Sequence, residues 1–170
     1  VEGEAPMGQM MRQNYWIPCL RAGALEADGA PIRVRLFGDN FVAFRATDGR
    51  VGFFDEACPH RGASLALARN EDCALRCIFH GWKIDVSGEV VDVPTECNEP
   101  EAFAKRVKVN HYPVREAGGL IWVWLGEGEA ARFPDLPFTH VQPHQVFVAS
   151  TKIPVNWLQG LEATVDSAHI

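Results

Sequence analysis

Two short segments of this 170-residue chain each place one cysteine close to one histidine. The first, "ACPHRGASL", contains Cys58 and His60, and the second, "RCIFHGW", contains Cys77 and His80. Thiolate sulfur and imidazole nitrogen are common ligands of zinc and iron in proteins. The pattern Cys-x-His, followed further along by Cys-x-x-His, therefore predicts a metal site built from two loops.

The mixture of ligands within each loop bears on which metal is bound. Zinc accepts two cysteines and two histidines in a tetrahedron, but zinc motifs usually pair cysteine with cysteine and histidine with histidine. A Rieske 2Fe-2S cluster instead has two thiolates on one iron and two neutral imidazoles on the other. Mixed loops favour this cluster, with structural zinc as the alternative. Two neutral nitrogens in place of thiolates leave less negative charge on the cluster, which eases its reduction.

The residues that follow both histidines resemble the Rieske family. Arg61 and Gly62 follow the first histidine, and Gly81 and Trp82 follow the second. We expect these four residues to surround the cluster, because glycine permits tight turns and lets backbone N–H groups point at sulfur. The resemblance implies a mainly β fold, a Rieske-type antiparallel β-sandwich with a small cluster-binding subdomain.

Three positions distinguish this chain from respiratory Rieske proteins, which the pattern also resembles. Those proteins carry an additional cysteine in each loop, joined in a disulfide, and a serine after the second glycine. Here the corresponding residues are Ala63, Phe79 and Trp82. Without the serine hydrogen bond the reduction potential should lie low in the Rieske range, nearer about −150 than about +300 mV. A low potential suits oxygen activation.

The C-terminal segment "NWLQGLEATVDSAHI" carries a second group of polar residues at helical spacing. These residues are Asn156, Gln159, Glu162, Asp166 and His169. At roughly 100° per residue they lie within an arc of about 140°, with apolar residues opposite. Such a face is usually only solvated, but this one ends in Asp-x-x-His rather than in lysine and glutamate.

The Asp-x-x-His ending resembles a helix that follows the Rieske domain in the α subunits of Rieske oxygenases. In that family a mononuclear Fe(II) is held by two histidines and one carboxylate. The resemblance implies that His169 is the first ligand of this iron. It also implies that Asp166 is the catalytic bridge, hydrogen-bonded to His80 of a neighbouring subunit, which requires a ring of subunits, a homotrimer.

Three stretches narrow the resemblance to the phthalate-dioxygenase-like branch, whose members are built from α subunits only. They are "MRQNYWIP", "CPHRGASL" and "NWLQGLE". Ala163 is a departure, since that branch often has glycine there. The chain also stops before a second histidine or a late carboxylate, so we expect a piece of a longer protein. As it stands it should carry electrons without catalysing oxygenation.

Strand-like runs separated by turn signals must position the two loops. Segment 7–18 has methionine and aromatic residues at helical spacing and ends at Pro18, which predicts a short N-terminal helix. The strand-like runs are "IRVRLF", "FVAFRA", "VGFFDE", "CALRC", "WKIDV", "VVDVP", "RVKVNHYPV", "LIWVWLG" and "QVFVASTKI". The first two alternate in polarity and the first three predict a β-meander within an antiparallel sandwich or barrel.

A Pro-rich connection, 127–144, marks an expected domain boundary. We expect a Rieske 2Fe-2S domain with its N-terminal helix over 1–143. Residues 144–170 would begin an α+β catalytic domain, truncated here, with a C-terminal helix.

Composition excludes several partners. The net charge is −6, and the 16 lysines and arginines form no basic block, so nucleic acid and membrane surfaces are not expected partners. No apolar run approaches the roughly 18 residues of a membrane span, and no signal peptide is visible, which indicates a cytoplasmic protein. Five cysteines are an odd number in a chain that needs no disulfide framework.

The resemblance implies an oxidoreductase, the terminal component of a Rieske aromatic-ring oxygenase. It would hydroxylate or O-demethylate an aromatic small molecule using O₂ and electrons from a flavin or iron-sulfur reductase. The cofactors would be a 2Fe-2S cluster and, in the complete protein, a mononuclear Fe(II). The alternative is a stand-alone Rieske ferredoxin with a C-terminal extension.

Overall fold

The computed structural model describes residues 1–169, apart from the side chains of Pro143 and His169. Its strands are β1 (Trp16–Arg21), β2 (Ile32–Leu36), β3 (Asp39–Arg45), β4 (Val51–Asp55), β5 (Arg69–Glu71), β6 (Ala74–Arg76), β7 (Lys83–Asp85), β8 (Val90–Asp92), β9 (Val114–Ala117) and β10 (Leu120–Trp124). Its α-helices are α1 (Pro6–Asn14), α2 (Pro100–Ala104) and α3 (Trp157–Val165), with short 3-10 turns at 22–24, 65–67, 137–139, 143–145 and 167–169.

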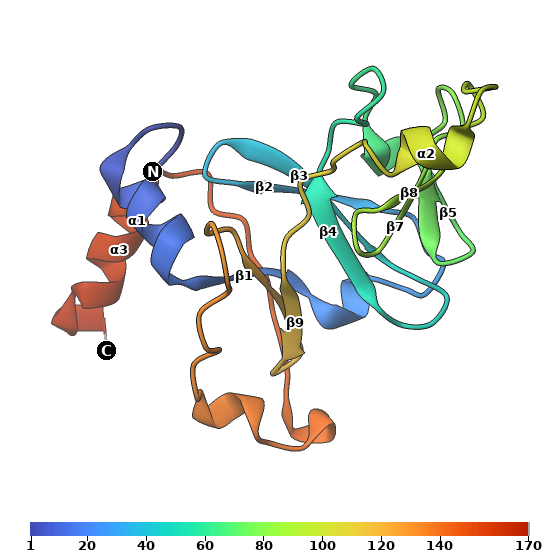
Figure 1. The fold of residues 1–170 in the computed structure, drawn as a ribbon. Coiled ribbons are helices and arrows are strands. Elements are labelled where there is room, and N and C mark those ends of the chain that lie inside the picture. The colour runs from blue at the N-terminus through green and yellow to red at the C-terminus, as the bar shows by residue number, and fades with distance from the viewer. Residues whose placement is uncertain (170) are drawn as a thin grey trace.

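Within the described residues, the strands form three antiparallel sheets. Their orders are β1-β10-β9, β2-β3-β4 and β5-β6-β7-β8. The small sheet lies with α2 at one end of the molecule, whereas α1 and α3 lie at the other end (Figure 1). The prediction of a mainly antiparallel β fold with an N-terminal helix is confirmed, and so is the meander formed by β2, β3 and β4.

The β2-β3-β4 sheet has a hydrophobic core on each face. Phe41 and Ala43 of β3 join a core with Ile121 and Val123 of β10. Their neighbours along β3, such as Phe44, join a second core under the small sheet. Because successive side chains of a strand point to opposite faces, a strand between two cores must be apolar at every position. The alternating polarity predicted for "FVAFRA" was therefore wrong.

The second core supports the part of the chain that carries the two loops. Leu75 of β6, Ile84 of β7 and Phe54 of β4 are completely buried in it. Burying a large apolar side chain contributes about 1.5–3 kcal/mol to folding. The loops that follow β4 and β6 therefore start from well-packed strands.

The N-terminal helix ends earlier than predicted. Helix α1 stops at Asn14, because Tyr15 has an extended backbone and strand β1 begins at Trp16. Pro18 lies inside β1 rather than ending the helix. Strand β1 is at the edge of its sheet, where a proline can be accommodated although it has no N–H to donate to a neighbouring strand.

Two predicted strands are not formed. Segment 106–114 follows β4 irregularly, with one isolated bridge between His111 and Phe54, and regular pairing starts only at Val114. Segment 145–153 is not a strand either, and among the described residues it pairs with no other segment. Strand β5 and helix α2 are elements that the sequence did not reveal.

The C-terminal helix is shorter than its polar pattern suggested. The Asn156 side chain caps α3 by accepting a hydrogen bond from the Gln159 N–H at 3.1 Å. The helix ends at Val165, and Asp166 has an extended backbone before a 3-10 turn over 167–169. The predicted continuous polar face through Asp166 and His169 is therefore wrong, because the helix axis is interrupted between them.

None of the helices in the described part of the chain is long and apolar enough to cross a membrane.

Candidate metal centre

The two cysteine-histidine loops are closed by the same pair of backbone hydrogen bonds. In the first, the Cys58 N–H donates to the Ala63 carbonyl at 2.8 Å, and the Gly62 N–H donates to the Cys58 carbonyl at 2.8 Å. In the second, the Cys77 N–H donates to the Trp82 carbonyl at 2.9 Å, and the Gly81 N–H donates to the Cys77 carbonyl at 3.0 Å. Each cysteine therefore begins a loop of identical length, although the histidines occupy different positions in it.

Each loop is closed by a glycine in the left-handed backbone region. The φ angle is +69° at Gly62 and +75° at Gly81. A Cβ atom at Gly62 would meet nothing within 4 Å, so the need for glycine there comes from the backbone angle and not from lack of space. The tight turns expected at these two residues are present.

The loops bring the four predicted ligand side chains together. Cys58 and Cys77 are each 3% exposed, and the two thiols are close enough to interact. The rings of His60 and His80 are half-buried, with centroids 4.5 Å apart and planes inclined at 71°. Residues separated by a whole hairpin in the sequence thus form one site.

Both histidines present an unused nitrogen. The Nδ1 atoms of His60 and His80 are buried and have no hydrogen-bond partner in the part of the chain described. Buried polar atoms are nearly always paired, so two unpaired atoms in contacting rings indicate a missing ligand. The residues present therefore fit a group that binds imidazole nitrogen.

The donors are arranged as two pairs rather than as one set of four. Among the side chains that the structure describes, which do not include that of His169, no three of His, Cys, Asp or Glu converge on a position that could hold a single metal ion. A single zinc ion needs four ligands around one point. A 2Fe-2S cluster needs only two protein ligands on each iron, because the sulfides supply the rest. The arrangement favours the cluster over zinc.

Burial sets the protonation of the site. Burial raises the pKa of the Cys58 thiol to about 11, while the backbone N–H groups of His60 and Arg61 act in the opposite direction by bonding to its sulfur. Burial also lowers the pKa of His60, assisted by His80 and then Arg61. Both shifts favour the neutral forms of the Cys58 thiol and the His60 imidazole.

Trp82 lies flat against His60. The two rings are 4.6 Å apart between centroids and only 4° from parallel. The indole N–H of Trp82 donates to Oγ1 of Thr95 at 2.8 Å, and the Phe103 ring of α2 meets the indole edge-on at 5.7 Å. The sequence motif identified Trp82, but nothing in the sequence indicated Thr95 or Phe103.

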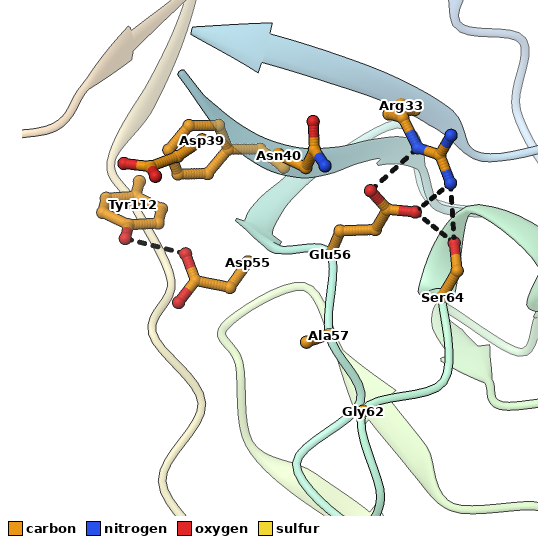
Figure 2. A pocket seen from close by; sticks show the side chains of 10 residues that line it. Arg33, Asp39, Asn40, Asp55, Glu56, Ala57, Gly62, Ser64 and Tyr112 are labelled. Atoms are coloured by element: carbon orange, nitrogen blue, oxygen red, sulfur yellow. Dashed lines mark hydrogen bonds and ion pairs between the residues drawn. The ribbon is translucent and has the colours of Figure 1, made fainter. Parts of the chain in front are cut away.

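A charged group lies at the base of each loop. Glu56, just before the first loop, is only 8% exposed. It accepts hydrogen bonds from Arg33 of β2 and from Ser64, just after the loop (Figure 2). These residues line a pocket of about 670 Å³ beside the loop. Arg76 holds the second loop by donating to the Gly81 carbonyl at 2.8 Å. Sequence reasoning missed both groups, because only the folded chain brings Glu56 to Arg33 and Arg76 to the Gly81 carbonyl.

Asp166 is not part of this cluster of side chains. It is exposed, and its Oδ1 accepts a hydrogen bond from the Ala168 N–H at 2.9 Å. Helix α3 lies at the end of the molecule opposite to the small sheet (Figure 1). The other residue predicted for an iron site, His169, has a side chain outside the described part.

A β fold with two mixed cysteine-histidine loops of matching geometry is the architecture of an iron-sulfur electron-transfer domain. The profile of the family described as Rieske [2Fe-2S] domain matches residues 15–113, and the chain belongs to that family. Its cofactor is the 2Fe-2S cluster.

Three of its relatives are named as oxygenase subunits. The chain is 48% identical to the phthalate 4,5-dioxygenase oxygenase subunit of Pseudomonas putida, over 99% of this chain and 38% of that protein. It is 43% identical to the 3-chlorobenzoate-3,4-dioxygenase oxygenase subunit of Comamonas testosteroni, over 96% of this chain and 38% of that protein. It is 37% identical to the 5,5'-dehydrodivanillate O-demethylase oxygenase subunit of a Sphingobium species, over 96% of this chain and 39% of that protein. The chain thus spans about 38% of the length of these relatives.

Solved structures agree with this grouping. Dicamba monooxygenase with non-heme iron and dicamba is similar with a TM-score of 0.64 and 27% identity, covering 73% of this chain and 37% of that one. The reduced complex between oxygenase and ferredoxin in carbazole 1,9a-dioxygenase is similar with a TM-score of 0.57 and 28% identity, covering 69% of this chain and 30% of that one.

Proposed function

We propose that Cys58 and Cys77 bind one iron of a 2Fe-2S cluster and that His60 and His80 bind the other through Nδ1. The observation that carries this assignment is the pair of buried, unpartnered Nδ1 atoms in contacting rings beside two facing thiols. When bound, the cluster accepts one electron and passes it on.

The loop residues prepare the site for that group. The histidines must be neutral to bind iron, and burial keeps His60 in that form by lowering its pKa. The thiols must lose their protons, so cluster binding releases them, most clearly at Cys58, whose pKa is raised. Gly62 and Gly81 each close one loop, and in the first loop the backbone N–H groups of His60 and Arg61 reach the Cys58 sulfur. Arg61 and Trp82 complete the surroundings.

We further propose that the chain is the cluster-bearing part of the terminal component of a Rieske aromatic-ring oxygenase. The complete protein would hydroxylate or O-demethylate an aromatic, often carboxylated, small molecule with O₂, drawing electrons from a flavin or iron-sulfur reductase. Support comes from relatives named as phthalate dioxygenase and dehydrodivanillate O-demethylase subunits. The similarity covers 99% of the chain and so extends over nearly all of residues 144–170, which a stand-alone ferredoxin would not require.

In the complete protein, we assign residues 1–143 to the Rieske domain and 144–170 to the start of a catalytic domain with a mononuclear Fe(II). His169 would be the first iron ligand, and Asp166 would hydrogen-bond His80 of a neighbouring subunit in a homotrimer. Two observations support a link between subunits. Helix α3 and the small sheet lie at opposite ends of the chain (Figure 1). Ile78 and Phe79, next to His80, are each 59% exposed, as suits a surface that another chain covers.

The experiment that tests the cluster assignment is metal and spectroscopic analysis of the chain purified without oxygen. We expect two irons and two acid-labile sulfides per chain, a red-brown colour and a Rieske-type EPR signal after reduction. Cys58→Ser should abolish all of these, whereas the matched control Cys73→Ser, outside the loops, should retain them. His80→Cys should retain a cluster at best with a lower potential, because a thiolate adds negative charge.

A colourless chain that contains zinc and no sulfide would overturn the assignment. Full cluster loading in Cys58→Ser would also contradict it.

A further inference from the structure

His60 is confined by two neighbouring aromatic rings. Its ring stacks on Trp82 at 4° from parallel and also contacts the His80 ring at 71°. A ring held flat against a large aromatic surface can change its plane only by losing that contact. The plane of His60, and with it the direction of its Nδ1 atom, therefore depends on where the Trp82 indole is held.

Two groups from outside the loops hold that indole. Oγ1 of Thr95, in the turn after β8, accepts the indole N–H at 2.8 Å. The Phe103 ring of α2 meets the indole edge-on at 88°. Trp82 is only 4% exposed, so no water can replace the hydroxyl freely. A buried N–H that loses its partner is costly, and the indole would move to satisfy it.

We propose that Thr95 is a positioning residue that acts through Trp82 to set the plane of the His60 ring. The inference rests on the proposed function, since it gives Thr95 a role in orienting one histidine ligand of the cluster. Thr95 bonds to Trp82, and Trp82 stacks on that ligand. Its effect is transmitted by one hydrogen bond and one ring stack.

The expected consequence concerns the reduction potential. A cluster with two thiolates and two neutral imidazoles carries no net charge when oxidised and one negative charge when reduced. Looser packing of Trp82 admits water next to the ring, and water stabilises the charged, reduced form. Loss of the Thr95 hydroxyl should therefore raise the potential. It should also broaden the EPR signal of the reduced chain, because the ring would adopt several orientations.

The test compares substitutions at Thr95 in the chain with its cluster. Thr95→Val keeps the shape and loses the hydroxyl, so we expect a higher potential and broader EPR features. Thr95→Ser keeps the hydroxyl and should behave like the unmodified chain. The matched control is Thr139→Val, which removes a threonine hydroxyl bonded to the Leu136 carbonyl, on the Pro-rich connection. This control should leave potential and EPR signal unchanged.

A second variant gives the same test without changing Thr95. Trp82→Phe loses the indole N–H, so it should raise the potential, and adding Thr95→Val to it should have no further effect. Its control is Trp122→Phe, which removes an indole N–H bonded to the Ala117 carbonyl in another sheet.

Three results would overturn the proposal. The first is an unchanged reduction potential and EPR signal in Thr95→Val or Trp82→Phe at full cluster loading. The second is an equal change of potential in Thr95→Ser and Thr95→Val. The third is a potential shift in the double variant that equals the sum of the two single shifts. If the unmodified chain binds no iron or sulfide, the proposed function fails instead. The two failures are thus distinguishable.

Discussion

At the scale of single residues, the site depends on charged groups that are not themselves candidate ligands. Glu56 lies below the first loop and Arg76 below the second. Hydrogen bonding from Arg33 lowers the pKa of Glu56, despite its burial, so this carboxylate is ionised at neutral pH. Ionised and hydrogen-bonded to both Arg33 and Ser64, it joins the end of the first loop to β2 (Figure 2).

The substitution Glu56→Gln tests how much these hydrogen bonds contribute to the free energy of unfolding. The substitution removes the charge from bonds of about 1.5–3 kcal/mol each, but a glutamine oxygen can keep one of them. The Arg33 side chain is 57% exposed, so water can solvate it after the change, which limits the loss. We expect the free energy of unfolding, measured by urea titration at pH 7, to fall by about 1–3 kcal/mol.

The matched control is Asp48→Asn. Asp48 pairs with Arg50, but both side chains are well exposed, at 40% and 61%. Exposed pairs contribute little to stability, so this control should leave the free energy of unfolding almost unchanged. Equal effects of the two substitutions would show that the burial of Glu56 is unimportant.

At the scale of elements, the small sheet and helix α2 act together. Helix α2 supplies Phe103 to the edge of Trp82, and the turn after β8 supplies Thr95. The helix spans only five residues, so its position depends on the backbone that leads into it. Its N-cap residue, Glu99, has a left-handed backbone with φ of 55° and is exposed. Non-glycine residues adopt this region at a cost of about 1 kcal/mol.

Glu99→Gly should therefore stabilise the chain. Glycine adopts positive φ without penalty, and the relief should exceed the added flexibility of the unfolded chain, giving a gain of about 0.5–1 kcal/mol in the free energy of unfolding. Glu101→Gly, two residues on and inside the helix, should have the opposite sign and lose about 1 kcal/mol. Thermal unfolding of both variants measures these changes. If both variants were less stable than the unmodified chain, the backbone at Glu99 would not be strained.

At the scale of the whole molecule, residues 1–143 contain the cores and the C-terminal segment lies outside them. Every described side chain from 149 to 168 is exposed. These include the apolar residues Trp157, Leu158 and Leu161, each close to half exposed. Such a surface suits a segment that packs against further parts of a longer protein, in line with the proposed domain boundary.

Removing residues 144–170 tests that boundary. Because few of these side chains are buried, we expect the free energy of unfolding to change by less than about 1 kcal/mol. Cluster loading and reduction potential should stay the same, since α3 lies at the end of the molecule opposite to the small sheet (Figure 1). A large loss of stability, measured by urea unfolding of both chains, would place the boundary further along the chain.

Local patterns predicted some elements well and others poorly. Strands β2, β3 and β4 were predicted because hydrophobic runs and turn residues are local signals. Segment 106–114 was predicted as a strand from the same signals but follows β4 irregularly, since regular pairing depends on the partner strand. The helix ending in Asp166 and His169 was overextended, because polar spacing alone does not reveal where the backbone leaves the helix.

The sequence by itself determined the candidate ligands and the two glycines, because metal chemistry and positive φ each restrict a position to one or two residue types. Gly62 and Gly81 could be predicted in this way, together with Cys58, His60 and their counterparts. Only the tertiary structure decided which residues hold those ligands in place. Thr95, Glu56 and Arg76 became visible only through contacts that folding makes, such as that of Glu56 with Arg33 on another strand, and a contact of that kind leaves no spacing in the sequence by which to recognise it.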